Sequence, residues 1–137
     1  MTESTKIAFV ARRISEVQDI SDLVGGLFPG NPNQQHAAGR ILLALKANPG
    51  LHSMSCLERQ HEISRRVLQR ARAKLARLGL IEYASRLSIR YGGQEGWRLS
   101  SRMSTALRQL ADRVDQWRAD VAPARLAKDE ALVGMLR

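Results

Sequence analysis

Four side chains between residues 65 and 70 carry hydrogen-bonding groups that can distinguish one base pair from another. Arginine can bind guanine O6 and N7 through two N–H groups, and glutamine can bind adenine N6 and N7 through its amide. The four are Arg65, Arg66, Gln69 and Arg70. On a helix, this spacing places them on one outer face. The pattern therefore predicts contacts with the edges of bases.

The residues around these four predict the helix that would present them. Ser64 can cap its N-terminus by accepting a backbone N–H. Apolar residues recur at helical spacing as far as Leu78, and Gly79 then suits the left-handed conformation that ends a helix. The expected inward face is Val67, Leu68, Ala71, Leu75 and Leu78.

A short helix is expected directly before this basic helix. Ser55 and Glu58 have the spacing of a capping box. Leu57 and Ile63 are apolar positions on either side of a tight connection. Two helices joined in this way predict a helix-turn-helix, whose second helix meets the major groove.

A hairpin is expected after the basic helix. Residues 80–90 alternate like a strand, residues 92–96 are rich in glycine, and residues 97–99 return. The cations Arg86, Arg90 and Arg98 could bring this hairpin to the DNA backbone or minor groove. Trp97 is expected in the core of the hairpin, and base stacking is the alternative. The core is favoured because stacking surfaces need several aromatic residues, and only 4% of the residues in this chain are aromatic.

The pattern Leu57, Ile63-Ser64, Val67, Leu75, Leu78-Gly79-Leu80-Ile81 resembles the winged-helix class of DNA-binding domains, over roughly residues 36–100. Two positions depart from that class. Glu58 stands where a small residue is usual, and Glu62 stands at a turn position usually held by glycine. The resemblance implies double-stranded DNA as the partner.

Further cations are expected to contact the DNA backbone, which positions a protein without reading sequence. Residues 58–90 carry nine basic and three acidic groups in a chain of net charge +9, a concentration that favours a polyanion partner. The alternative is a solvated basic surface. With the hairpin arginines included, the expected backbone or wing contacts are Ser64, Arg59, Arg72, Lys74, Arg77, Arg86, Arg90 and Arg98.

Apolar periodicity predicts an amphipathic helix over residues 4–24, ended by Gly25-Gly26, then a turn-rich linker to residue 33 and a helix over residues 34–47. The N-terminal helix is expected either to clamp the domain or to join a dimer interface.

The C-terminal part predicts a helix from near residue 101 to about residue 121 with a narrow apolar seam. The seam residues are spaced by 4, 3, 4, 3 and 4, which is the heptad pattern of paired helices. We expect a homodimer, and the alternative is packing on the N-terminal helix of the same chain. A short last helix, 124–136, could join that bundle or fray. The predicted interface is Met103, Leu107, Leu110, Val114, Trp117 and Val121.

The expected fold is mainly α with a small β-hairpin wing: a winged helix-turn-helix core flanked by N- and C-terminal dimerisation helices. Residues 1–33 form the N-terminal helix and linker, 34–100 the DNA-binding domain, and 101–137 the dimerisation helices. This layout is similar to that of MarR-type regulators in order and length. The acidic-arginine wing motif of that family is missing from residues 86–93.

Other chemistry finds few suitable residues. His52 and Cys56 are one helical turn apart, but His61 lies off that face, and metal sites normally need three or four ligands. Phosphate-loop, nucleophile-elbow and paired-carboxylate motifs are missing. We expect no metal, no cofactor and no enzymatic activity. The lack of a long apolar run or signal-peptide pattern, and the single cysteine, predict a cytoplasmic, nucleoid-associated protein without membrane contact.

Together these features predict a dimeric, sequence-specific regulator of transcription that binds double-stranded DNA. One alternative is a replication, partition or chromosome-architecture protein with little sequence selectivity. Another is a winged-helix module that docks proteins. An unknown small-molecule effector, bound between the core and the dimer helices, also stays open.

Overall fold

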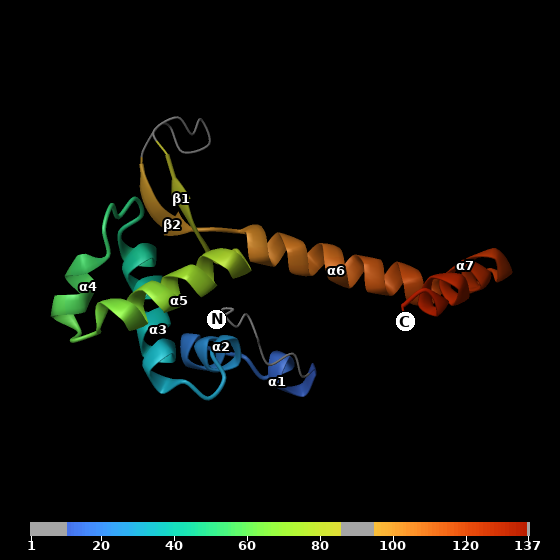
Figure 1. The fold of residues 1–137 in the computed structure, drawn as a ribbon, viewed down its shortest axis with the longest axis horizontal. Coiled ribbons are helices and arrows are strands. Elements are labelled where there is room, and N and C mark those ends of the chain that lie inside the picture. Colours follow the sequence, from blue (N-terminus) through green and yellow to red (C-terminus); the bar gives the residue numbers. More distant parts are fainter. Residues whose placement is uncertain (1–10, 86–94, 137) are drawn as a thin grey trace. The chain divides into compact units, whose positions relative to one another are not determined.

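The computed structural model describes residues 11–85 and 95–136, without the side chains of residues 12 and 13. The described chain is mainly helical with a small two-stranded antiparallel sheet, which confirms that part of the expected fold (Figure 1). The chain divides into two compact units, Met1–Met103 and Ser104–Arg137. The elements are α1 (Ala11–Ser15), α2 (Ile20–Leu27), α3 (Pro32–Ala47), α4 (Ser55–Gln60), α5 (Arg65–Leu78), β1 (Ile81–Ala84), β2 (Gly96–Leu99), α6 (Arg102–Ala119) and α7 (Pro123–Gly134).

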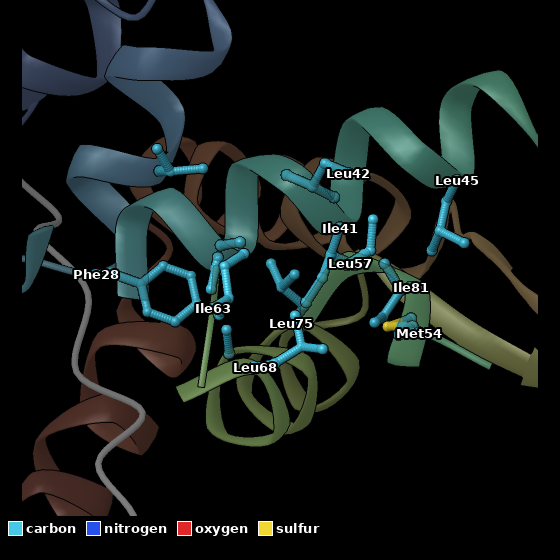
Figure 2. Packing of buried hydrophobic residues seen from close by; sticks show 14 of the residues in the cluster. Phe28, Ile41, Leu42, Leu45, Met54, Leu57, Ile63, Leu68, Leu75 and Ile81 are labelled. Atoms are coloured by element: carbon cyan, nitrogen blue, oxygen red, sulfur yellow. The ribbon is translucent and has the colours of Figure 1, made fainter. Parts of the chain in front are cut away.

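The core of the first unit forms mainly between α3 and α5 (Figure 2). Ile41 and Leu45 of α3 and Leu75 of α5 are almost completely buried, together with Ile81 of β1. Leu68, Ala71 and Leu75 are buried at the spacing that the sequence predicted for the inner face of α5. Packing of this face against α3 fixes which side of α5 is left to solvent.

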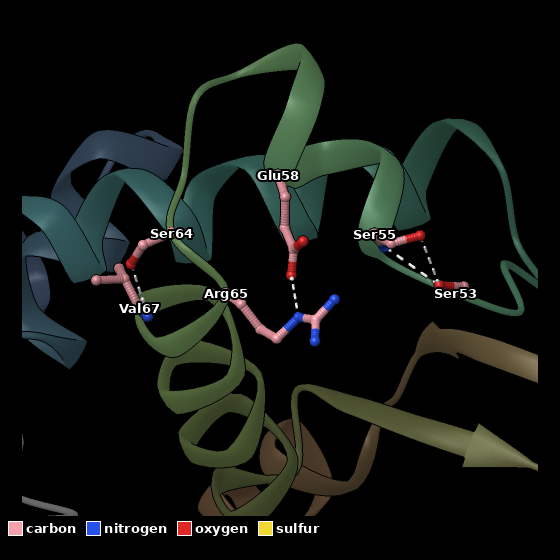
Figure 3. Close-up of polar contacts among 6 residues, drawn as sticks. All are labelled: Ser53, Ser55, Glu58, Ser64, Arg65 and Val67. Carbon is pink, nitrogen blue, oxygen red and sulfur yellow. Dashed lines mark hydrogen bonds and ion pairs between the residues drawn. The ribbon is translucent and has the colours of Figure 1, made fainter.

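Both ends of α5 confirm the sequence signals. The Ser64 hydroxyl accepts a hydrogen bond from the Val67 N–H at 3.2 Å, as Figure 3 shows. Gly79 has φ +85°, the left-handed conformation that ends helices. A Cβ at Gly79 would also lie 2.9 Å from the Met103 nitrogen, whose N–H donates to the Gly79 carbonyl at 2.9 Å. Glycine is thus required there for both its conformation and its small size.

The start of α4 differs from the prediction. The N-cap residue is Met54, whose side chain makes no capping bond, so the expected Ser55–Glu58 capping box is wrong. The Ser53 hydroxyl instead accepts the Ser55 N–H at 3.2 Å (Figure 3). Met54 is 2% exposed, and anchoring it in the core starts the helix one residue earlier than a Ser55 cap would.

The sheet pairs β1 with β2, with Ile81 opposite Leu99 and Tyr83 opposite Trp97. The segment before α4 lies along β2, because the Trp97 N–H donates to the Leu51 carbonyl at 2.8 Å and the Gly50 N–H donates to the Trp97 carbonyl at 3.0 Å. This is an isolated bridge, not a full strand.

The N-terminal part departs from the single helix expected over residues 4–24. Within the described residues, α1 and α2 are separate helices, and Asp19 caps α2 by accepting the Asp22 N–H at 2.9 Å. The expected end at Gly25-Gly26 is wrong, since α2 continues to Leu27 and is followed by buried Phe28. Burial of apolar side chains outweighs the cost of about 1 kcal/mol for each glycine in a helix.

In the second unit, α6 and α7 contain no buried residue. The Trp117 indole N–H donates to the Asp129 carboxylate at 2.9 Å, which links α6 to α7. None of the helices in the described ranges is both long enough and apolar enough to cross a membrane.

Candidate nucleic-acid interface

The four residues predicted to contact bases all lie on the exposed side of α5. Arg65, Arg66, Gln69 and Arg70 are exposed, while Leu68 points into the core. The helix contains six cations and no acidic residue. The structure therefore brings the predicted set together on one solvent-facing, positively charged surface.

The connection between α4 and α5 contains a left-handed residue that is not glycine. Glu62 has φ +52°, and it is one of the two positions where the sequence differs from the winged-helix pattern. This conformation costs a non-glycine residue roughly 1–2 kcal/mol. The neighbouring residues hold it: the Ile63 N–H donates to the Glu58 carbonyl at 3.1 Å, and the Ile63 side chain is buried. The turn thus sets where α5 begins.

Glu58, the second departure from the class, lies beside the first residue of α5. Its Oε1 is 3.5 Å from Nε of Arg65 (Figure 3). A cation at a helix N-terminus opposes the helix dipole, and the carboxylate offsets this. The Arg65 side chain is 75% exposed, so the pair contributes at most about 1 kcal/mol to stability. Its effect is to orient the guanidinium group.

Lys74 is not available for the backbone contact that the sequence predicted. It is 7% exposed, and its Nζ lies 4.7 Å from the centroid of the Phe28 ring. Burial, and then the charge of Arg77, lowers the pKa of Lys74. The sequence predicted a turn-rich linker at Phe28, so this cation–π partner was not foreseen.

Arg98 is also turned inward, which corrects its expected role as a wing contact. It is 9% exposed and lies opposite the buried Glu82 in the hairpin register. Glu82 Oε2 is 3.1 Å from Nε of Arg102 and accepts the Ser100 hydroxyl at 3.1 Å. Strand alternation puts Arg98 on the same sheet face as Glu82, where these polar groups gather.

Arg72 is half-buried and lies over the Trp97 ring, with its Cζ 5.1 Å from the ring centroid. Tyr83 meets the same ring edge to face at 5.4 Å, and its hydroxyl donates to Glu95 at 2.7 Å. Trp97 packs against the core cluster, in agreement with the expectation that it is a core residue and not a stacking surface for bases. It thereby connects α5 to the hairpin.

The other predicted backbone contacts have different positions. Arg59 and Arg77 are exposed, and the hydroxyl of Ser64 is used in the helix cap. Arg86 and Arg90 lie outside the described residues.

Sequence reasoning missed a basic group beside the turn. Burial first, and then the charges of Arg40 and His36, lowers the pKa of His61 at the end of α4. His36 and Arg40 are one helical turn apart on α3, a spacing that was the available signal. The Arg40 guanidinium places a positive charge near His61 at the end of α4.

The residues predicted to form the dimer interface divide into two groups. Met103 is half-buried and packs against the core of the first unit. Leu107, Leu110, Val114 and Trp117 on α6 are 37% to 56% exposed. Val121 is 70% exposed and follows the end of α6 at Ala119.

In the part of the chain that the structure describes, no three His, Cys, Asp or Glu side chains are grouped as a metal site. Comparisons of the chain with family profiles, curated proteins and solved structures find no match. A functional proposal therefore depends on the charge and geometry of α5 and its surroundings.

Proposed function

We propose that this protein is a winged helix-turn-helix protein that binds double-stranded DNA at specific sequences and regulates transcription. Three features support the fold: the left-handed turn at Glu62 between α4 and α5, the hairpin after α5, and the isolated bridge that joins Leu51 to Trp97 of β2. In this arrangement α4 and α5 form the helix-turn-helix and the β1–β2 hairpin is the wing.

The observation that carries the proposal is that some cations of α5 contact aromatic rings, whereas others face solvent. Arg72 and Lys74, both predicted to contact the backbone, are occupied with Trp97 and Phe28. Arg66, Gln69 and Arg70 are exposed with Arg65. Non-specific binding depends on the number of phosphates neutralised, whereas specificity depends on groups that reach base edges. The groups that face solvent here include every one predicted to read bases.

The first two turns of α5 would enter the major groove, where arginine reads guanine and glutamine reads adenine. Glu58 would hold Arg65 at the helix start, and Arg59 and Arg77 would contact phosphates. The protein acts as a homodimer, so two copies of α5 meet successive major grooves about 34–36 Å apart. The role is binding, without catalysis.

A protein of chromosome architecture or replication would use the same helix with little selectivity. A docking module would not need a helix of six cations and no carboxylate, so the charge of α5 argues against it. Lys74 and Arg98 are buried, and Arg72 is half-buried over the Trp97 ring. These three cations therefore contribute less to binding through the DNA backbone alone, which favours the sequence-specific mode.

The test measures fluorescence anisotropy of labelled duplex DNA with the parent protein and with Arg66→Ala/Arg70→Ala. We expect the double variant to lose about 2–6 kcal/mol of binding free energy, at about 1–3 kcal/mol for each base contact. Arg108→Ala, which removes an exposed arginine from α6, is the control and should bind like the parent. Equal binding by all three proteins would contradict the assignment of α5.

A further inference from the structure

The second unit exposes large apolar side chains on both α6 and α7. Six of them, which we call the α6–α7 residues, are 37% to 56% exposed: Leu107, Leu110, Val114 and Trp117 of α6, and Leu126 and Leu132 of α7. The unit has 34 residues, and no residue of α6 or α7 is buried. Below about 40 residues a chain rarely buries enough surface to be stable alone. The α6–α7 residues therefore need a partner.

The exposed apolar area of the whole second unit, which includes these six side chains, matches one side of a protein dimer. Ten large apolar side chains after residue 103 are 37% to 80% exposed. Each fully exposed aliphatic side chain presents roughly 60–120 Å² of apolar surface, so the ten present on the order of 500 Å². Homodimer interfaces are about 65% apolar, which gives about 800 Å² per copy. This is the area that a stable dimer needs.

Charge identifies a second copy of this chain as the occupant. Residues 1–103 carry sixteen basic and eight acidic groups, whereas residues 104–137 carry six basic and five acidic groups. Two copies that met through the first unit would repel each other, but two second units are nearly neutral. The apolar residues of α6 also follow the 3–4 spacing that interlocks with another helix of the same spacing.

The order of side chains along α6 favours one orientation of the two copies. In a parallel pair, Trp117 would stack on Trp117 of the partner subunit. The flanking positions would also place Arg113 beside Arg118 of the partner subunit, on both sides of the pair. Two like-charge contacts and two bulky rings in one layer oppose this orientation.

In an antiparallel pair centred at Asp112, the same residues fit better. Trp117 meets Leu107 of the partner subunit, and Val114 meets Leu110 of the partner subunit, so large and small side chains alternate. The antiparallel pair has one like-charge contact in place of two, between Arg113 and its own counterpart across the two-fold axis. The indole N–H of Trp117 donates to Asp129 of α7, and the residue is still 56% exposed, so much of the ring is accessible to a partner.

We infer that the α6 helices of two copies pair antiparallel, with Trp117 packed against Leu107 of the partner subunit and α7 flanking the pair. This deepens the homodimer of the proposed function, on which it rests, and it does not depend on DNA contact. Self-association of this kind should occur without DNA.

The orientation can be tested with exposed positions that leave the apolar seam unchanged. Cys56, the only cysteine, is replaced by Ser, and Ser104→Cys and Arg118→Cys are made separately in that background. The two full-length variants, one carrying a size tag, are co-expressed and treated with a short bis-maleimide. An antiparallel pair predicts cross-linked dimers between Ser104→Cys and Arg118→Cys chains, and almost none from either variant alone. Cross-linking within each variant alone would show a parallel pair and overturn the inference.

Light scattering without DNA tests self-association itself. We expect a dimer for the parent and for the control Arg108→Glu, and a monomer for Leu110→Glu/Val114→Glu with unchanged helical circular dichroism. A monomeric parent would overturn the inference. Anisotropy on the same samples separates the two proposals, because a monomer that still binds duplex DNA leaves the DNA-binding proposal standing, whereas a dimer without DNA affinity contradicts only that proposal.

Discussion

The ammonium group of Lys74 lies 4.7 Å from the centroid of the Phe28 ring, which joins α5 to the segment that follows α2. The lysine is on the inner side of a helix whose outer side carries Arg66 and Arg70. Charge on α5 therefore serves two purposes. The outer cations are available to a ligand, and the inner one is part of the packing between α5 and the N-terminal helices.

Replacement of Lys74 should affect packing without affecting DNA contact. We expect Lys74→Met to bind duplex DNA with the same salt dependence as the parent, because the Lys74 side chain is buried and packs over the Phe28 ring. Arg77→Ala removes one expected phosphate contact, so the fall of log K with log salt should become less steep by about 0.9. Anisotropy titrations between low and moderate salt measure both slopes. A reduced slope for Lys74→Met would contradict the buried position.

The lowered pKa of Lys74 predicts a pH dependence of stability. Between the folded pKa and the ordinary value of 10.5, the unfolded chain binds more protons than the folded one, so the free energy of unfolding rises as pH rises through that window. Urea unfolding at pH values approaching 10.5 should show this increase in the parent relative to Lys74→Met. Parallel curves for the two proteins would show that Lys74 does not titrate differently on folding.

Glycine at position 62 should stabilise the protein. Glu62 has φ +52°, which costs a side chain about 1–2 kcal/mol, and glycine loses about 0.5–1 kcal/mol of this gain through its greater freedom when unfolded. We expect Glu62→Gly to raise the free energy of unfolding by about 0.5–1 kcal/mol. Gln60→Gly, in the neighbouring helix α4, is the control and should lower it by a similar amount. Chemical denaturation gives both values, and destabilisation by Glu62→Gly would contradict the turn geometry.

A side chain at position 96 should disrupt the hairpin. Gly96 has φ +138°, and a Cβ there would collide with the Gly50 carbonyl. We expect Gly96→Ala to lower the free energy of unfolding by at least about 2 kcal/mol. Gly39→Ala on α3 is the matched control, since its Cβ would meet nothing within 4 Å, and it should gain about 1 kcal/mol. Similar melting temperatures for the two variants would show that β2 does not approach Gly50 closely.

Local sequence signals predicted the elements that depend on local physics. The bounds of α5 follow from Ser64 and Gly79, which act within one helical turn of themselves, and the exposed face of α5 follows from apolar periodicity. The positions of Arg98 and Lys74 did not follow, because each depends on a residue distant in sequence, Glu82 and Phe28. The length of α2 was missed for the same reason, since core burial decided where it ends.

Some features of the candidate surface could be predicted from the sequence, and others could not. Arg65 and its neighbours were found from residue type and helical spacing alone. The contact between Glu58 and Arg65 depends on the geometry of the turn between α4 and α5. That geometry could not be predicted from the sequence, because Glu62 stands at a position where glycine is usual.

The most direct measurement is selection of bound sequences from a random pool of duplex DNA, with the parent and Arg66→Ala/Arg70→Ala compared side by side. We predict that the parent enriches an inverted repeat whose half-sites are about 34–36 Å apart, and that the variant loses preference at the bases those arginines contact. Binding without enrichment of any sequence would contradict the proposal of a sequence-specific regulator.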